Sequence, residues 1–340
     1  MDDLTIYKEI LDHLEKIISD KNVLEEIYTT MIRGAVNSGE TQDSRESLLD
    51  WFNSRFMPNS IILDRSDYSK ALIRSLWISP NLASLDFAGG RLRDFAQLWT
   101  DTARGFLGEI AVQKFLKKNF DMSIYLETRR GKAEEFMSSD IRVIEQGTNK
   151  HRESKIKVSI KTTKLNGRWL EIPESQFKQS DVFILVKLGI SRYHFISYLK
   201  ETIKNLLKEG LNLNELDEKQ VEILANDIPN WNSIPAYIPG FVDKANLTLP
   251  IHKLSFNFCR KRKKDAYGIR PISKIEITDG IGLFSRSEIL KVEEIKNATV
   301  PQDIPIVVAG IEKEIDGNFY ASSGQLTFAH EEWKKIVAKF

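Results

Sequence analysis

The chain holds two short apolar runs with alternating side chains, at residues 140–144 and 156–161. On a β-strand, successive side chains point to opposite faces, so Ser159 and Lys161 project together from the face opposite the apolar residues. Asp140 opens the first run, 21 residues before Lys161 (161 − 140). The two runs therefore predict adjacent strands that bring a carboxylate and an ammonium group to one place.

A carboxylate beside a lysine suits metal-dependent cleavage of phosphodiester bonds. The carboxylate can hold Mg²⁺, which neutralises charge on the phosphate and lowers the pKa of a bound water. The ammonium group steadies the attacking hydroxide or the charge that develops on the phosphate. Asp140 and Lys161 are therefore the first candidate catalytic residues.

The order of these motifs resembles the PD-(D/E)xK nuclease superfamily, whose best-studied members are the type II restriction endonucleases. The motif reads Ser139-Asp140 and then Ser-Ile-Lys at 159–161. Upstream, the segment Gly-Phe-Leu-Gly-Glu-Ile-Ala at 105–111 looks like the family's helix, which adds one acidic residue to the metal cluster. That residue is Glu109.

The resemblance continues beyond the lysine. Segments 161–164, 170–174 and 180–186 look like the part of many restriction enzymes in which a helix and a fourth strand follow the catalytic lysine. The similar stretch covers roughly residues 102–198, less than a third of the chain. It implies an α/β fold with a restriction-endonuclease-like mixed β-sheet core flanked by helices.

Two positions depart from the family pattern. Ser139 replaces a proline that shapes a turn, which is a mild change. Ser159 stands where the family has Asp or Glu, and a hydroxyl is a poor ligand for Mg²⁺. One branch of restriction enzymes has such a Ser-x-Lys motif and recruits a glutamate from the following helix. In this chain that residue would be Glu174, which follows Pro173 as in a first helical turn, with Glu171 as the alternative.

The resemblance implies a role for each of these residues. Asp140, with Glu109 or Glu174, would bind Mg²⁺. Lys161 would stabilise the nucleophile or the scissile phosphate, and Ser159 would orient a water or a metal-bound carboxylate. The implied activity is that of a type II restriction endonuclease that cuts double-stranded DNA as a homodimer, with a separately encoded DNA methyltransferase as a candidate partner.

A rival motif, Glu153-Ser154-Lys155, matches the acidic pattern literally. It lies in the polar stretch 149–155, ahead of the apolar part of the strand, where side chains are loosely held. Catalysis needs groups fixed to a fraction of an ångström, which favours Lys161. A second alternative is that Asp140 and Lys161 are the ends of two ordinary strands, and only the ordered set of motifs favours a nuclease.

Three basic stretches are candidates for contact with DNA phosphates. The densest run of positive charge follows Cys259, and aromatic residues flank it. Phosphate contacts from such a run would give an affinity that falls with salt. A solvated turn between two strands is the alternative. The candidate DNA-binding residues are Arg129, Arg130, Lys164, Arg260, Lys261, Arg262 and Lys263.

Composition limits the class of protein. The chain has 340 residues, of which 41% are hydrophobic and 29% charged, so it has an ample core. A single cysteine excludes a disulfide scaffold or a Cys-rich zinc site. No apolar run approaches twenty residues, which predicts a cytoplasmic protein without a membrane span. The net charge of only +1 means that DNA binding must come from local basic patches.

The chain is expected to divide into three regions. Residues 1–100 are predicted to form a helical N-terminal region and residues 101–200 the nuclease core. Residues 201–340 are predicted to form a smaller mixed α/β region that packs on the core and is a candidate for contact with DNA. Helical spacing at 201–224 is followed by several prolines between 229 and 239, which indicate a connection or boundary.

Three other functions stay open. A structure-specific or repair nuclease of the same fold would ignore intact duplex DNA. A DNA-binding protein with an inactive nuclease core is suggested by Ser159. A protein-interaction role would involve no nucleic acid. The chain has no phosphate-binding loop of the Gly-x-x-x-x-Gly-Lys type, which argues against ATP-driven translocation.

Overall fold

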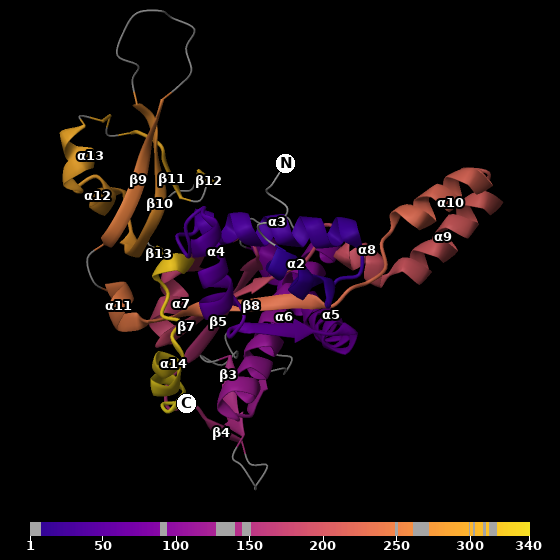
Figure 1. The fold of residues 1–340 in the computed structure, drawn as a ribbon, viewed down its shortest axis with the longest axis horizontal. Helices are drawn as coiled ribbons and strands as arrows, with labels where there is room; N and C mark the ends of the chain where they lie inside the picture. The colour runs from indigo at the N-terminus through magenta and orange to yellow at the C-terminus, as the bar shows by residue number, and fades with distance from the viewer. Residues whose placement is uncertain are drawn as a thin grey trace, which may run out of the picture.

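The computed structural model has a mixed α/β fold, as predicted from the sequence. Helices surround β-sheets that run through the body of the molecule (Figure 1). The likeness of the core to restriction endonucleases stays a prediction. The structure describes residues 8–88, 94–126, 140–144, 151–248, 251–260, 272–298, 300–301, 303–308, 311–312 and 318–340.

The central sheet mixes parallel and antiparallel pairs. In spatial order its strands are β1 (Ser60–Leu63), β8 (Ile234–Asp243), β7 (Val182–Leu188) and β5 (Val158–Lys164). β5 and β7 run parallel, whereas β8 is antiparallel to both β7 and β1. Every residue of β7 is buried, which is typical of a strand covered on both faces.

Pro229 lies in the connection between α10 and strand β8, as expected, but Pro235 and Pro239 lie within β8 itself. Pro235 is the second residue of the strand. Pro239 lies where the pairing with β7 shifts register, between Tyr237 and Gly240. A bulge of this kind tolerates a residue that has no N–H to donate. The prolines therefore shape a central strand instead of ending the domain.

Two long helices, α5 (Arg65–Ala88) and α6 (Phe95–Phe120), cover one face of this sheet. Asp94 caps α6 by accepting a hydrogen bond from the Gln97 N–H at 2.8 Å. Asp121 ends the helix in the left-handed conformation, with φ of 50°. The apolar side of α6 packs on the alternate residues of β5 and β7 that face it, so the helix is fixed against the sheet.

The N-terminal helices lie on the opposite face. Tyr237 belongs to their core, whereas its neighbours in β8, Ala236 and Ile238, belong to the core under α6. Asp20 and Ser44 cap two of these helices through their side chains. The elements are α2 (Lys8–Glu15), α3 (Lys21–Asn37), α4 (Arg45–Trp51) and a π-helical turn, η1 (Phe52–Phe56).

A second sheet combines C-terminal strands with one strand from the middle of the chain. In order, its strands are β12 (Ile311–Glu312), β11 (Ile306–Val308), β10 (Ile272–Phe284), β13 (Asn318–Ser322) and β6 (Trp169–Ile172), and β9 (His252–Arg260) also pairs with β10. β6 pairs with β13 in an antiparallel register in which Glu171 lies opposite Tyr320. The C-terminal strands are thus joined directly to the segment that follows β5.

A third, small sheet lies beside the edge of the central one. It contains β2 (Ile124–Leu126), β3 (Ile141–Ile144) and β4 (His151–Glu153). The remaining helical elements are α7 (Glu174–Gln179), α8 (His194–Tyr198), α9 (Lys200–Asn212), α10 (Glu218–Asp227), α11 (Lys244–Thr248), α12 (Arg286–Ile289), α13 (Glu293–Asn297), η3 (Ser323–Gln325) and α14 (His330–Val337).

Two features project from opposite ends of the body. Strands β9 and β10 extend at one end, and helices α9 and α10 extend at the other (Figure 1). Within the described part of the chain, no helix is both long enough and apolar enough to cross a lipid bilayer.

Candidate active site

Asp140 is held against the edge of the central sheet by backbone hydrogen bonds. Its N–H donates to the Val158 carbonyl at 2.9 Å, so the start of β3 lies beside the start of β5. Its Oδ2 accepts a hydrogen bond from the Ile160 N–H at 2.6 Å. These contacts fix the carboxylate next to the strand that carries Ser159 and Lys161.

Ser159 and Lys161 approach Asp140 from β5. The Ser159 hydroxyl is hydrogen-bonded to the Asp140 carboxylate, and its side chain is buried. The Lys161 Nζ donates to the Oε1 of Gln176 in α7. Burial lowers the pKa of Lys161, although the charge of Asp140 opposes this shift. The structure thus brings these predicted residues together and adds Gln176.

Glu109, on α6, lies close enough to Asp140 to interact with it electrostatically. The preceding residue, Gly108, packs on Thr162 of β5 so closely that an added Cβ would lie 1.8 Å from the Thr162 Oγ1. Glycine therefore lets the helix approach the strand and bring Glu109 toward Asp140. Burial raises the pKa of Glu109 well above its ordinary value, and the charge of Asp140 raises it further.

Asp140 shows the same kind of perturbation. Burial raises the pKa of Asp140, while the hydrogen bond from Ile160 and the charge of Lys161 act in the opposite direction. The charge of Asp140 disfavours the ionised form of Glu109, and a bound cation would relieve this repulsion. Perturbed groups of this kind, gathered from separate elements, are typical of functional sites.

Arg74 is a further charged residue near Glu109, and no sequence pattern indicates it. It lies on α5, is partly exposed, and its positive charge opposes the rise in the pKa of Glu109. It precedes Glu109 by 35 residues (109 − 74), so nothing in the local pattern connects the two. Only the packing of α5 on α6 brings it there.

The expectation for Glu174 finds no support in this geometry. Glu174 is 59% exposed and pairs with Lys178 of the same helix at 2.8 Å. Residues two apart in a helix point about 200° apart, so Gln176 faces Lys161 while Glu174 faces solvent. The alternative, Glu171, lies within the second sheet and accepts hydrogen bonds from Asn318 and Tyr320 of the neighbouring strand β13.

In the rival motif, Lys155 lies apart from this cluster, and the side chain of Glu153 is outside the part of the chain that the structure describes. Lys155 is exposed and stands in the connection between β4 and β5, outside either strand. The carboxylate of Asp140 instead accepts a hydrogen bond from the Ile160 N–H, which belongs to β5.

Most of the predicted DNA-binding residues lie outside the part of the chain that the structure describes. Lys164 is exposed at the end of β5. The backbone of Arg260 pairs with Ile272 at the end of β9. Residues outside the described part of the chain are Arg129, Arg130, Ser139, Lys261, Arg262 and Lys263.

The carboxylates of Asp140 and Glu109 are suitable ligands for Mg²⁺. Among the described residues, no group of three His, Cys, Asp or Glu side chains is placed to hold a metal ion. Mg²⁺ needs fewer, because proteins commonly bind it through one or two carboxylates while it keeps several waters and takes substrate phosphate oxygens. Asp140 and Glu109, both partly buried and both with a raised pKa, are two carboxylates of this kind.

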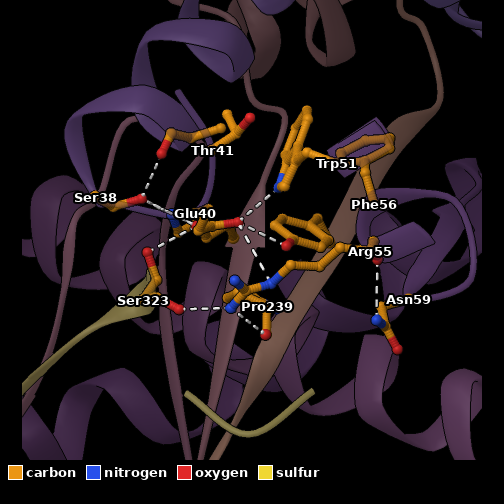
Figure 2. Close-up of polar contacts among 12 residues, drawn as sticks. Ser38, Glu40, Thr41, Trp51, Arg55, Phe56, Asn59, Pro239 and Ser323 are labelled. Atoms are coloured by element: carbon orange, nitrogen blue, oxygen red, sulfur yellow. Dashed lines mark hydrogen bonds and ion pairs between the residues drawn. The ribbon is translucent and has the colours of Figure 1, made fainter. Parts of the chain in front are cut away.

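A second buried polar cluster surrounds Glu40, at the end of α3 (Figure 2). Burial alone would raise the pKa of Glu40, but the charges of Lys187 and Arg55 and several hydrogen bonds lower it to about 2. The donors to its carboxylate are Lys187 Nζ at 2.6 Å, Tyr237 OH at 2.6 Å, Ser323 Oγ at 2.7 Å, Ser38 Oγ at 3.0 Å and Trp51 Nε1 at 3.1 Å.

This cluster ties distant parts of the chain together. Arg55 donates to the carbonyls of Pro239 at 3.0 Å and Ser323 at 2.6 Å (Figure 2). The side chains of Glu40 and Lys187 are 0% and 1% exposed, so the cluster has no contact with solvent. It joins the N-terminal helices, the central sheet and η3. The one sequence signal for it is a lysine in the otherwise apolar strand β7.

Comparisons of the chain with protein-family models, curated proteins and solved structures found no match. What this chain does is therefore inferred from its motif residues and from the geometry around them.

Proposed function

We propose that this chain is a Mg²⁺-dependent endonuclease that hydrolyses double-stranded DNA at specific sites, as a type II restriction endonuclease does. One observation supports the proposal most strongly. Asp140 is hydrogen-bonded to the edge of the central sheet and interacts electrostatically with Lys161 of β5 and Glu109 of α6, and each of the three groups has a perturbed pKa.

Asp140 and Glu109 would hold the metal. When bound there, Mg²⁺ supplies charge neutralisation at the scissile phosphate and lowers the pKa of a bound water. The backbone N–H of Ile160 and the hydroxyl of Ser159 orient the Asp140 carboxylate by hydrogen bonds. Ser159 thus acts on the metal site through Asp140 rather than as a ligand.

Lys161 would act on the phosphate. Its ammonium group stabilises the negative charge that develops on the phosphate oxygens or on the attacking hydroxide. The amide oxygen of Gln176 accepts a hydrogen bond from Nζ and so holds this flexible side chain in position. Arg74, near Glu109, would add a second positive charge for a DNA phosphate.

The partners follow from this activity. Lys164 and the basic stretch 260–263 would contact DNA phosphates, with affinity that falls as salt rises. A homodimer would let each copy cut one strand of a palindromic site. We further propose a cytoplasmic location and a separately encoded DNA methyltransferase that protects the host sites.

Ser159 favours a second candidate, a DNA-binding protein with an inactive nuclease core. The position where the family carries a metal-binding carboxylate holds a buried hydroxyl instead. That protein would retain DNA without cutting it, and a Ser159→Asp change would restore metal-dependent cutting.

Plasmid and bacteriophage DNA, incubated with Mg²⁺ or with EDTA, test the proposal. We expect discrete fragments with Mg²⁺, and a rate loss on the order of 100-fold or more in Lys161→Ala, the size typical of removing one transition-state contact. Lys155→Ala, which removes the exposed lysine of the rival motif, is the matched control and should cut normally.

Other results of this experiment would support one of the alternative functions. DNA that is bound but stays intact with Mg²⁺ supports the inactive core. Cutting that survives in Lys161→Ala and disappears in Lys155→Ala supports the rival motif. Cutting of branched or nicked DNA alone supports a structure-specific nuclease.

A further inference from the structure

Helices α9 and α10 form an arm, residues 200–227, that extends away from the body (Figure 1). Neither helix contains a buried residue. The base of the arm is fixed, because the Lys200 Nζ donates to the Ile228 carbonyl at 2.5 Å and so joins its two ends. The arm therefore has a defined root but no core of its own.

The conformation of the arm is nevertheless specified locally. Asn214 adopts a left-handed conformation, with φ of 57°, in the turn that follows α9. Asp217 and Gln220 form a reciprocal capping box at the start of α10. Such signals define two helices and the turn between them. The arm is built as a regular helical hairpin, although nothing in the described body covers it.

Large apolar side chains on the arm remain uncovered. Leu206 and Leu213, seven residues apart and thus on one side of α9, are each 65% exposed. On α10, Ile223 is 49% exposed and Leu224 is 42% exposed. Two helices form a single layer, and a single layer buries its apolar side only against a second one. The arm therefore has the character of half of a helical bundle.

The charges of the arm limit which partner surface can pack against it. Three lysines and two glutamates give α9 a net charge of +1, whereas residues 215–227 carry five acidic side chains and one lysine, a net charge of −4. The arm as a whole is thus acidic and repels DNA and anionic membranes. A two-fold axis between two identical arms can place α9 of one copy against α10 of the other, and this arrangement brings the complementary charges together.

We propose that the arms of two copies of this chain pack face to face as a four-helix bundle and hold the protein as a homodimer. Bundles of this kind bury one apolar side of each helix. The inference names the surface of the dimer that the proposed function uses, but the contact itself requires no nuclease activity.

The molar mass of the full chain in solution, measured by light scattering or sedimentation, tests this inference. We expect twice 39.1 kDa for the wild type and 39.1 kDa for the double variant Leu206→Glu, Leu213→Glu. Ile73→Glu, which charges an equally exposed side chain on α5, is the matched control and should remain a dimer. Circular dichroism confirms that each variant is folded.

Two results would overturn the inference. One is a wild type that stays at 39.1 kDa up to its solubility limit, and the other is a dimer that persists in the double variant. DNA cleavage measured on the same samples reports separately on the proposed function. A dimer that the double variant dissociates, but that does not cut DNA, would uphold the arm contact and reject the nuclease.

Discussion

Gly108 of α6 packs directly on Thr162 of β5, and a methyl group at Gly108 would lie 1.8 Å from the Thr162 hydroxyl oxygen. This contact sets how close the helix that carries Glu109 comes to the strand that carries Lys161. The distance between the two sides of the candidate site therefore depends on the absence of one side chain.

Gly108→Ala should separate α6 from β5. Overpacking of this kind lowers the free energy of unfolding by about 1–3 kcal/mol. The rate of DNA cleavage should also fall, because Glu109 moves away from Asp140. Gly105→Ala is the matched control, since nothing lies within 4 Å of a Cβ added there. Denaturant titration and cleavage rates measure both variants. Equal behaviour of the two would contradict the role of this contact.

Gln176→Ala should remove the acceptor that positions Lys161. A hydrogen bond to a charged group contributes about 1.5–3 kcal/mol, so cleavage should slow by on the order of tenfold or more. Glu174→Ala, on the other side of the same helix, should cut at the wild-type rate. Single-turnover cleavage distinguishes the two. If only Glu174→Ala lost DNA cleavage, Glu174 would bind Mg²⁺ as the sequence led us to expect.

Arg74→Ala should move the pH dependence of cleavage upward. The positive charge of Arg74 opposes the raised pKa of Glu109, so its removal lets that pKa rise further. Glu109 then needs a higher pH to ionise and bind metal. The pH of half-maximal cleavage measures the shift, and Lys70→Ala, an exposed change on the same helix, serves as control. An unchanged or lower value would place Arg74 outside the site.

Glu40→Gln should destabilise the whole fold. Breaking a buried ion pair by removing one partner typically costs about 3–5 kcal/mol, because the remaining charge, here on Lys187, stays buried. Glu201→Gln, which alters an exposed ion pair on the arm, should leave the denaturation midpoint unchanged. A Glu40→Gln variant as stable as the wild type would show that the cluster is not a structural tie.

The same carboxylate predicts how stability depends on acid. The folded pKa of Glu40, about 2, lies below its usual value of 4.5, so the native state binds the proton more weakly than the unfolded chain. The contribution of Glu40 is complete above pH 4.5 and is lost as the pH falls toward about 2. Urea midpoints across this range should fall less steeply in Glu40→Gln. Parallel slopes would contradict the assignment.

Local patterns were enough to predict the centre of the site. The alternation around Val158 and Lys161 depends only on strand geometry, and the apolar face of α6 depends only on helical spacing. Both patterns can be predicted because each depends on the local geometry of one strand or one helix, not on distant parts of the chain. For this reason strand alternation could predict Asp140 beside Lys161, whereas Glu109 was identified from the resemblance of residues 105–111 to a helix of the nuclease superfamily. The catalytic roles of all three residues stay predictions.

Residues placed by long-range packing could not be identified in this way. Gln176 was missed because Glu174, two residues away, has the more obvious chemistry, and only the orientation of α7 distinguishes them. β6 pairs with β13, about 150 residues later in the chain, and no local signal in 169–172 indicates that partner. Glu40 likewise gains three partners, Lys187, Tyr237 and Ser323, from distant segments of the chain.

The central claim is that Asp140 holds the metal at which DNA is cut. The most direct test is the single-turnover rate of plasmid cleavage in Mg²⁺ by the wild type and by Asp140→Asn, a change that keeps the shape of the side chain and removes its charge. We predict Mg²⁺-dependent cutting by the wild type and a loss on the order of 100-fold or more in the variant. Cleavage at the wild-type rate by Asp140→Asn would contradict the account.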